Sequence, residues 1–449
     1  MEMKNSIYES QFGFRAGRSC EHALINAKYT ICEALDKRKI SLLLLIDFSK
    51  AFDMVEHDIL LGKLYHYGIR GIAYDWMKSY LTGREQFVSV GGKDSEKSVL
   101  KYGVPQGSIL GPLLFIIYIN DLPNLFKTAK FILYADDANI FLTGSNIKEI
   151  KEQVAQLGDE LVKWVNCNGL ALNLRKTNYI IFSRSKVDCD INLTINNVII
   201  ERKKEARFLG VILDENLTWG AHIAGIKQKM SRYVGIIYKL KNKVPLSVRI
   251  QIYHSLIQSH LNYCSIIWGF AAKTHIAGLF SAQKKGLRAI MPGFTSSYYK
   301  DGKLPTSTKA HFIKYNIMTV HSIICKNTLM LLVKASYFAD QVPPSIIDII
   351  IQSNKPNDES QLTVWNDKFG YGKYRNSFFF KGPLLREQLN YPQYSSTGCL
   401  ASMQLLKKRL KNCILEIQGS GDIDEWLPKN NILNSITGIR KSARLANTN

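Results

Sequence analysis

The chain has no long apolar segment, and this absence argues against a protein that spans a membrane. Its longest apolar run, Ile109–Ile119, contains Gly111 and Pro112 and is far shorter than the ~20 residues of a spanning helix. The first residues contain no apolar stretch of the kind found in secretory signals. The composition is 46% hydrophobic and 21% charged, without the bias of a disordered or fibrous chain, so it predicts globular domains.

Paired cysteines are also absent. The eight cysteines of the 449 residues are scattered, with no Cys-x-x-Cys pair and no cysteine–histidine spacing typical of zinc. This pattern argues against a disulfide framework and against a structural zinc site. We interpret the cysteines as free thiols of a protein in a reducing compartment.

Acidic residues are missing from one long stretch of a basic protein. The net charge is +22, and residues 1–200 hold 24 basic and 22 acidic side chains, against 35 and 15 in residues 201–449. Between Asn216 and Lys300 there are 12 lysines or arginines and no Asp or Glu. A merely soluble surface mixes the two signs, so this stretch predicts contact with a polyanion such as nucleic acid. A solvated basic face without function is the alternative.

The apolar pattern predicts mixed α and β structure in the first half of the chain and mostly helices in the second. Short apolar runs predict strands, and apolar spacings of three or four predict helices. The expected strands are 41–46, 86–90, 98–104, 131–134, 140–142, 179–182, 191–200 and 206–213, and the expected helices are 49–66, 108–122, 146–166 and 220–243. Residues 91–94 and 135–139, rich in Gly, Asp and Asn, predict turns.

Three carboxylates lie at the expected ends of buried strands. Asp47 follows the first strand, and Asp136 and Asp137 lie in the turn between two others. Buried together without a neighbouring Lys or Arg, they would repel one another, and a divalent cation such as Mg²⁺ would remove this conflict. Two ions about 3.5–4 Å apart are a known device for nucleotidyl transfer. Taken alone, an Asp-Asp pair is more often a turn or a helix cap.

Six motifs follow one another along the chain. They are Gln11–Ser19 (QFGFRAGRS), Leu45–Asp53 (LIDFSKAFD), Gly103–Pro112 (GVPQGSILGP), Tyr134–Asp137 (YADD), Leu172–Thr177 (LNLRKT) and Phe208–Val211 (FLGV). Each is weak by itself, but in this order and spacing they resemble the reverse transcriptases of non-LTR (LINE-type, jockey-like) retrotransposons. The resemblance covers Gln11–Arg288 and is fainter beyond.

The resemblance implies an α+β right-hand polymerase fold. Fingers and palm with an antiparallel sheet would occupy 1–215, an all-helical basic thumb 216–300, and a mixed C-terminal extension 301–449. The implied activity is that of an RNA-directed DNA polymerase, which adds dNTPs to a primer 3′-hydroxyl. The implied partners are template RNA, primer DNA, their RNA–DNA hybrid and dNTPs, with no membrane partner, and the oligomeric state stays open.

The resemblance also assigns the catalytic chemistry to named residues. Asp47, Asp136 and Asp137 are implied to hold two Mg²⁺ ions, for which Mn²⁺ could substitute, and the main-chain carbonyl of Phe48 is implied to face a metal. Lys176 is implied to meet the leaving pyrophosphate, as a general acid in one interpretation. A lysine exposed at the start of a strand is the alternative for Lys176.

A second group of residues is implied to bind the nucleotide. The group consists of Arg15, Arg18, Phe52, Gln106 and Gly107. Arg15, helped by Arg18, would clamp phosphates, and Gln106 would bond the nucleotide while Gly107 lets the main chain approach. Phe52 matches the family's steric gate, a ring that leaves no room for a 2′-hydroxyl. The alternatives are helix packing for Phe52 and an ordinary turn for Pro105–Gly107.

The remaining implied sites contact the nucleic acid itself. Phe208, Leu209, Gly210 and Val211 match the primer grip, although a core strand is the alternative. On the expected helix 220–243, the backbone contacts would come from Lys227, Lys229, Arg232 and Lys239.

Some features of the family are missing from the sequence. The first motif already begins at Gln11, so we expect a chain truncated at its amino end, without the family's endonuclease and the earliest part of the fingers. We find no Cys/His knuckle and no carboxylate set for RNase H. A truncated copy that binds nucleic acid without polymerising is one alternative. A group II intron maturase is another, although residues 46–53 and 208–214 fit the LINE-type pattern better.

Localisation follows from the family's habit of priming on chromosomal DNA. That habit implies action in the nucleus, with a cytoplasmic RNA–protein particle. The basic clusters 202–204 and 407–409 are weak import signals.

Overall fold

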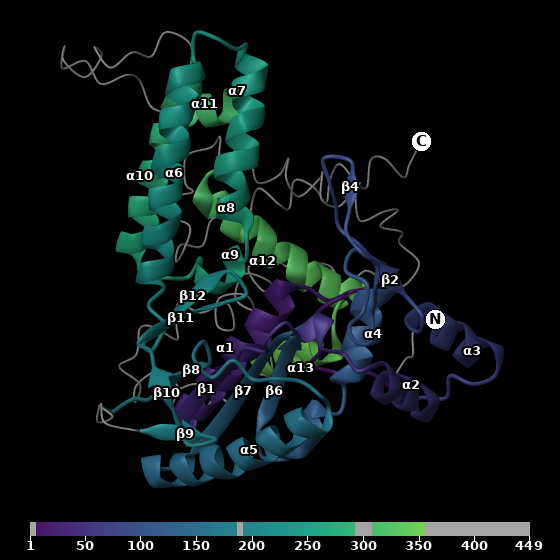
Figure 1. Cartoon of the computed structure of the whole chain (residues 1–449). Coiled ribbons are helices and arrows are strands. Elements are labelled where there is room, and N and C mark those ends of the chain that lie inside the picture. The colour runs from purple at the N-terminus through teal and green to yellow at the C-terminus, as the bar shows by residue number, and fades with distance from the viewer. Residues whose placement is uncertain (1–5, 186–191, 292–307, 355–449) are drawn as a thin grey trace, which may run out of the picture. The chain divides into compact units, whose positions relative to one another are not determined.

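The computed structural model describes residues 6–185, 192–291 and 308–354, which form two compact units (Figure 1). Of these residues, the first unit contains those up to Leu209 together with Asp214–Asn216 and Pro343–Ile346, and the second contains the rest. The expected C-terminal extension beyond residue 354 and the basic cluster 407–409 lie outside the described residues.

A six-stranded sheet forms the centre of the first unit, with strand order β6-β7-β1-β8-β10-β9. The bounds are β1 (Ile40–Ile46), β6 (Lys130–Tyr134), β7 (Asp137–Gly144), β8 (Asn178–Phe182), β9 (Leu193–Ile195) and β10 (Val198–Arg202). Neighbouring strands are antiparallel except β8 and β10, which run parallel. The antiparallel prediction is wrong at that one pair, because the β9–β10 hairpin joins β8 through its second strand.

The continuous apolar run of β1 is explained by the burial of both faces of this strand. Leu42 and Leu44 are fully buried in one cluster with Leu157 of α5 (Ile147–Cys167), the helix below the sheet in Figure 1. Leu43 is equally buried but points to the opposite face, where α1 (Cys20–Asp36) contacts β1 and β6. A strand covered on both faces needs apolar residues at successive positions.

Between β1 and β6 the chain forms short helices and two small ribbons. These are η1 (Ala51–Asp53), α2 (His57–His66), α3 (Ile72–Leu81), α4 (Leu110–Tyr118) and η2 (Leu122–Leu125), with β2 (Glu85–Gln86) paired to β5 (Ser98–Val99) and β3 (Ser89–Val90) paired to β4 (Lys93–Asp94). The single helix expected over 49–66 is therefore wrong, because Lys50 has a left-handed backbone and Glu56 is extended. A hairpin forms where one was expected, but its turn is shorter than 91–94 because Lys93 and Asp94 belong to β4, and the strands expected over 86–90 and 98–104 are divided between the two ribbons.

The second unit is mainly helical. The chain leaves β11 (Glu205–Phe208) for β12 (Val211–Asp214) and then forms α6 (Gly220–Leu240), α7 (Leu246–Tyr253), the π-helical turn η3 (His254–Gln258), α8 (Ser259–Asn262), α9 (Ser265–Trp268), α10 (Lys273–Ile290), α11 (Thr308–Lys314), α12 (Val320–Tyr337), η5 (Ala339–Gln341) and α13 (Pro344–Asn354). The buried amide of Gln283 joins three of these segments. It donates to Tyr253 Oη (3.1 Å) and the Met318 carbonyl (2.8 Å) and accepts from the Val320 N–H. None of the helices in the described ranges is long and apolar enough to span a membrane.

Candidate active site

Strand pairing brings the three predicted carboxylates to one edge of the sheet. In the antiparallel pair of β1 and β7, Ile46 lies opposite Ala138, so the next position along places Asp47 beside Asp137. Strands β6 and β7 are joined by only two residues, Ala135 and Asp136, with Tyr134 opposite Asp137. The turn expected over 135–139 is thus shorter than predicted, and Asp137 is the first residue of β7. The tight turn leaves both Asp136 and Asp137 at the sheet edge, beside Asp47.

The electrostatic interactions within this group are unfavourable. The pKa of the Asp137 carboxyl is raised to about 6, first by burial and then by the negative charges of Asp136 and Asp47. Both neighbouring carboxylates therefore act on Asp137. Such a group favours binding of a cation, and carboxylate oxygens are ligands suited to Mg²⁺.

The three carboxylates suit a metal ion by the chemistry of their oxygens and by their positions at neighbouring strand ends. Within residues 6–185, 192–291 and 308–354, no three His, Cys, Asp or Glu side chains are already arranged to hold an ion. The donor set of Asp47, Asp136 and Asp137 nevertheless suits a hard divalent cation. Burial and then the two neighbouring negative charges raise the pKa of Asp137, and a cation would offset those charges. These three residues would hold it.

Lys176 is the cation that the structure places closest to this group. Its Nζ lies 4.0 Å from Asp47 Oδ2, on an exposed side chain. The segment is fixed to the end of β1, because the Asn173 N–H donates to the Asp47 carbonyl (2.8 Å) and the Asp47 N–H donates to Thr177 Oγ1 (3.4 Å). Thr177 was not predicted as a site residue, although it directly follows Lys176 in the LNLRKT motif.

Phe48 and Phe52 both contribute their rings to the core of the first unit. Phe48 is buried 6.4 Å from the ring of Trp164, and its main chain forms a bridge to Leu172. Phe52 is half-buried and stacks on Phe115, with ring centroids 4.3 Å apart. Packing therefore accounts for both rings, and the metal contact of the Phe48 carbonyl and the gate role of Phe52 stay predictions.

Gln106 and Gly107 lie exposed on a loop that is fixed against Asp53. Gln106 Nε2 donates to Asp53 Oδ1 (2.8 Å), and the Val104 N–H donates to the Phe52 carbonyl (2.9 Å). Gly107 has φ +81, a conformation that favours glycine. The loop is thus joined to the segment that follows Asp47, and Asp53, the last residue of LIDFSKAFD, is a site residue that we did not predict.

Arg15 and Arg18 both donate to main-chain carbonyls of the amino-terminal segment. Arg15 Nη1 donates to the carbonyls of Tyr8 (2.8 Å) and Gln11 (3.4 Å). Arg18 donates to the Glu9 carbonyl and lies 5.5 Å from the Phe12 ring centroid. The pKa of Arg18 is lowered to about 10, first by burial and then by Arg15. Both arginines hold the amino-terminal segment in place, and a phosphate contact for either stays a prediction.

The predicted primer-grip residues are divided between the two units, and the residues predicted to contact the nucleic-acid backbone belong to the second unit. Phe208 is buried in the first unit, and Val211 is buried in the second. Between them, Leu209 (φ 45) and Gly210 (φ 79) both have left-handed backbones. Exposed on α6 of the second unit are Lys227, Lys229, Arg232 and Lys239. Their roles toward nucleic acid stay predictions.

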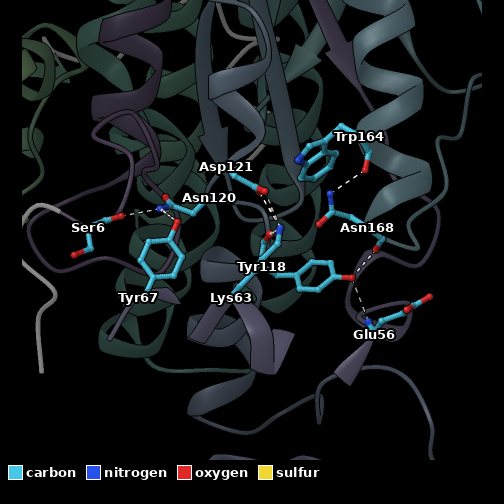
Figure 2. A network of polar contacts seen from close by, with 9 residues as sticks. All are labelled: Ser6, Glu56, Lys63, Tyr67, Tyr118, Asn120, Asp121, Trp164 and Asn168. Carbon is cyan, nitrogen blue, oxygen red and sulfur yellow. Dashed lines mark hydrogen bonds and ion pairs between the residues drawn. The ribbon is translucent and has the colours of Figure 1, made fainter. Parts of the chain in front are cut away.

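A polar network among the helices of the first unit was not predicted at all (Figure 2). Lys63 Nζ donates to the Tyr118 carbonyl (2.5 Å) and to both oxygens of Asp121 (2.9 and 3.0 Å). Tyr118 Oη donates to the Asn168 carbonyl (2.5 Å) and accepts from the Glu56 N–H (3.3 Å). Burial lowers the pKa of Lys63 and raises that of Tyr118 to about 12, so we expect a neutral phenol at neutral pH. The network joins α2, α4 and the end of α5.

Comparison with known proteins identifies the first unit. Residues 1–213 match the protein family described as "Reverse transcriptase (RNA-dependent DNA polymerase)". This match covers slightly less than half of the chain. The RNA-directed DNA polymerase from mobile element jockey of Drosophila funebris is 29% identical over 299 residues, covering 64% of this chain and 32% of that protein. The probable RNA-directed DNA polymerase from transposon X-element of Drosophila melanogaster is also 29% identical, over 297 residues, covering 65% and 32%.

The matches to these two relatives extend over about two thirds of this chain, and the predicted resemblance to non-LTR retrotransposon reverse transcriptases is confirmed. The chain spans about a third of the length of these curated relatives. Similarity to solved structures is weaker. A telomerase from Candida albicans in complex with a TWJ fragment of telomeric RNA shares 13% identity at a TM-score of 0.40, covering 67% of this chain and 56% of that chain.

Proposed function

We propose that this chain is an RNA-directed DNA polymerase that copies the RNA of a non-LTR retrotransposon into DNA. The observation that carries the proposal is the meeting of Asp47, Asp136 and Asp137 at one sheet edge, inside a reverse transcriptase domain. The substrates would be dNTPs, and the partners would be template RNA, a DNA primer and the hybrid that they form.

The three carboxylates would hold two Mg²⁺ ions, or Mn²⁺ in their place. Such ions lower the pKa of a primer 3′-hydroxyl and neutralise the charge of the triphosphate and the leaving pyrophosphate. Lys176, whose ammonium lies 4.0 Å from Asp47, would supply a further positive charge for the pyrophosphate. Its side chain is exposed and could follow the phosphates, while its neighbours Asn173 and Thr177 fix the segment to the end of β1.

The loop of Gln106 and Gly107 would bind the incoming nucleotide. The hydrogen bond from Gln106 to Asp53 links this loop to the segment that follows Asp47, so a nucleotide on the loop would lie near the carboxylates. Phe52, one residue before Asp53 and stacked on Phe115, would limit the space beneath the sugar. Nucleic acid would be held through phosphate contacts by the exposed lysines and arginine of α6.

Primer extension tests the proposal. The purified chain should extend a DNA primer on an RNA template with MgCl₂ and dNTPs, and Asp136→Ala should lower the rate to background. Asp159→Ala is the matched control, because Asp159 is an exposed residue of α5 outside the site. Equal extension by wild type and Asp136→Ala would refute the proposal.

The second candidate function is nucleic-acid binding without polymerisation. The observation that favours it is the exposed basic face of α6 in a stretch without acidic residues. It predicts salt-sensitive binding of an RNA–DNA hybrid together with no extension at any Mg²⁺ concentration. Extension by the wild-type chain would exclude it.

A further inference from the structure

A short segment, Ser10–Gly13, lies beside the end of β6 and contacts the turn that carries the predicted catalytic carboxylates. We call this segment the strap. The strap lies along β6, where the Phe12 N–H donates to the Leu133 carbonyl (2.8 Å) and the Leu133 N–H donates to the Ser10 carbonyl (2.9 Å). It therefore acts as a short parallel neighbour of the strand that ends at Tyr134. Its position brings the first motif of the sequence to the YADD motif, 124 residues further along the chain.

Gln11 makes the contact with the turn itself. Its Oε1 accepts hydrogen bonds from the Gly13 N–H (2.9 Å) and the Ala135 N–H (3.2 Å). The side chain is 1% exposed, and its Nε2 has no acceptor among the described residues. Burial of the Gln11 amide is favourable through its oxygen. This oxygen accepts from two main-chain N–H groups that would otherwise be buried without partners.

The turn needs such support because its first residue is strained. Ala135 has φ +55, a left-handed conformation that is strained for an alanine and persists only where surrounding contacts fix it. Asp136 and Asp137 follow directly, so the conformation of Ala135 sets the direction in which both carboxylates leave the turn. Gln11 Oε1 is bonded to the N–H of this strained residue.

Gly13 closes the strap onto the turn by direct contact. A Cβ at Gly13 would overlap the Ala135 nitrogen and would lie 3.1 Å from the Tyr134 carbonyl carbon. Both neighbouring atoms belong to the main chain, so they cannot move aside as a flexible side chain would. The strap and the turn are therefore packed backbone to backbone at this point.

The strap is itself held at its amino-terminal side. Arg15 bonds the carbonyls of Tyr8 and Gln11, and the Tyr8 N–H donates to Asn120 Oδ1 (2.7 Å). Asn120 in turn donates to the hydroxyl of Tyr67 and to the carbonyl of Ser6, both at 2.7 Å (Figure 2). These bonds restrict the position from which Gln11 reaches the turn.

We propose that Gln11 is a positioning residue that fixes the YADD turn, acting through the Ala135 N–H, so that Asp136 and Asp137 are held ready to bind divalent cations. The inference rests on the proposed polymerase function. It assigns Gln11 no contact with substrate. It also gives the first motif a role in the geometry of the carboxylates, separate from the phosphate contacts proposed for Arg15 and Arg18.

The test compares Gln11→Met with Gln153→Met in the full chain. Methionine is close to glutamine in size but cannot accept the two hydrogen bonds. Gln153 is a half-buried glutamine of α5 whose Nε2 donates to the Thr143 carbonyl (3.1 Å), so Gln153→Met controls for the loss of an interior amide. Thermal melting of both variants would show that they are folded at the assay temperature.

Two measurements report on the carboxylates. In primer extension, the Mg²⁺ concentration for half-maximal rate should rise about 10- to 100-fold in Gln11→Met, the usual range for groups that orient metal ligands. Binding of Mn²⁺ to the chain without substrates, followed by electron paramagnetic resonance, should weaken by a similar factor. Gln153→Met should change neither value, because a loss of folded protein alone lowers the amplitude without shifting the half-saturation point.

The outcomes separate this inference from the proposed function. If the wild-type chain does not extend a primer, the polymerase proposal fails, whatever Gln11 does. If the wild type extends and Gln11→Met shows wild-type Mg²⁺ and Mn²⁺ half-saturation, the positioning role is refuted while the polymerase stands. A shift of both values in Gln11→Met alone supports it.

Gly13→Ala gives an independent perturbation of the same contact. The added methyl would push on Ala135 while Gln11 is kept, so the same shift in Mn²⁺ half-saturation is expected. Gly62→Ala in α2 is the matched control, because a Cβ there meets nothing within 4 Å. Wild-type Mn²⁺ binding by Gly13→Ala would contradict the proposed coupling between the strap and the turn.

Discussion

The two units of this chain differ in the sign of the charge that they gather. The first gathers carboxylates, and the second exposes basic side chains. The first unit gathers Asp47, Asp136 and Asp137 at one sheet edge, and the exposed ammonium of Lys176 lies 4.0 Å from Asp47. The second unit exposes lysines and an arginine along α6, in a stretch from 217 to 300 without a single acidic residue. The first unit thus concentrates negative charge that a cation would offset, whereas the second exposes positive charge that would attract phosphates.

The largest effect is expected from changing a carboxylate of the first unit. Asp137→Asn keeps the shape of the side chain and removes its charge, and it should lower the extension rate more than about 100-fold, beyond the usual effect of an outer-shell change. Hybrid binding should be unchanged, because we assign it to the second unit. Extension kinetics and fluorescence anisotropy on the same samples would measure both effects.

Asp159→Asn on α5 is the matched control for this variant and should behave as wild type. If Asp137→Asn lost hybrid binding and extension to the same degree, the division of labour between the two units would be wrong.

The sequence was sufficient to predict these carboxylates but not the contacts that hold them. Asp47 and Asp137 could be found because each adjoins a strand whose apolar run is readable locally. The bond from Gln11 to Ala135 and the bond from Lys63 to Asp121 join residues 124 and 58 positions apart. Such contacts depend on how the elements pack, and no local pattern records them.

The predicted arginines show the same limit. The fork of Arg15 suits a phosphate, but it suits main-chain carbonyls equally well, and the carbonyls of Tyr8 and Gln11 are the acceptors that the fold places within reach. Sequence identifies the donor, whereas the fold decides the acceptor. The shortened β6–β7 turn is a similar case, since both of its aspartates favour turns but only Asp136 lies in one.

A smaller effect is expected on the nucleotide selectivity of the first unit. Phe52→Val removes the ring stacked on Phe115 and should lower the preference for dNTPs over rNTPs about 10- to 100-fold, the range for a change in the shape of a pocket. The ratio of kcat/KM for the two nucleotides measures this preference. Phe126→Val is the control, because Phe126 also packs partly buried against the same core. Equal loss of selectivity in both variants would assign the effect of Phe52 to packing alone.

The second unit can be tested through its salt dependence. Lys229→Gln and Arg232→Gln should each make the plot of log affinity against log salt shallower by about 0.7–0.9 for each phosphate that the variant no longer neutralises, with a modest decrease in affinity. The maximal extension rate on saturating hybrid should not change. Lys151→Gln, an exposed lysine of α5, is the control. An unchanged salt slope in both α6 variants would contradict a phosphate-binding role for this helix.

The smallest expected effect is a pH dependence of the stability of the chain, which arises from Asp137 in the first unit. Because the pKa of Asp137 is raised from 3.8 to about 6, its protonated form stabilises the folded chain below pH 3.8, and this contribution is lost as the pH rises through 6. Bound Mg²⁺ favours the ionised carboxylate, so the stabilisation by MgCl₂ relative to EDTA should grow between pH 5 and pH 7 by a few degrees in Tm. Asp137→Asn should reduce this growth, and hybrid binding, which we attribute to lysine and arginine, should stay constant over the same range. A Mg²⁺ effect of equal size at both pH values would show that Asp137 is not the group through which the cation acts.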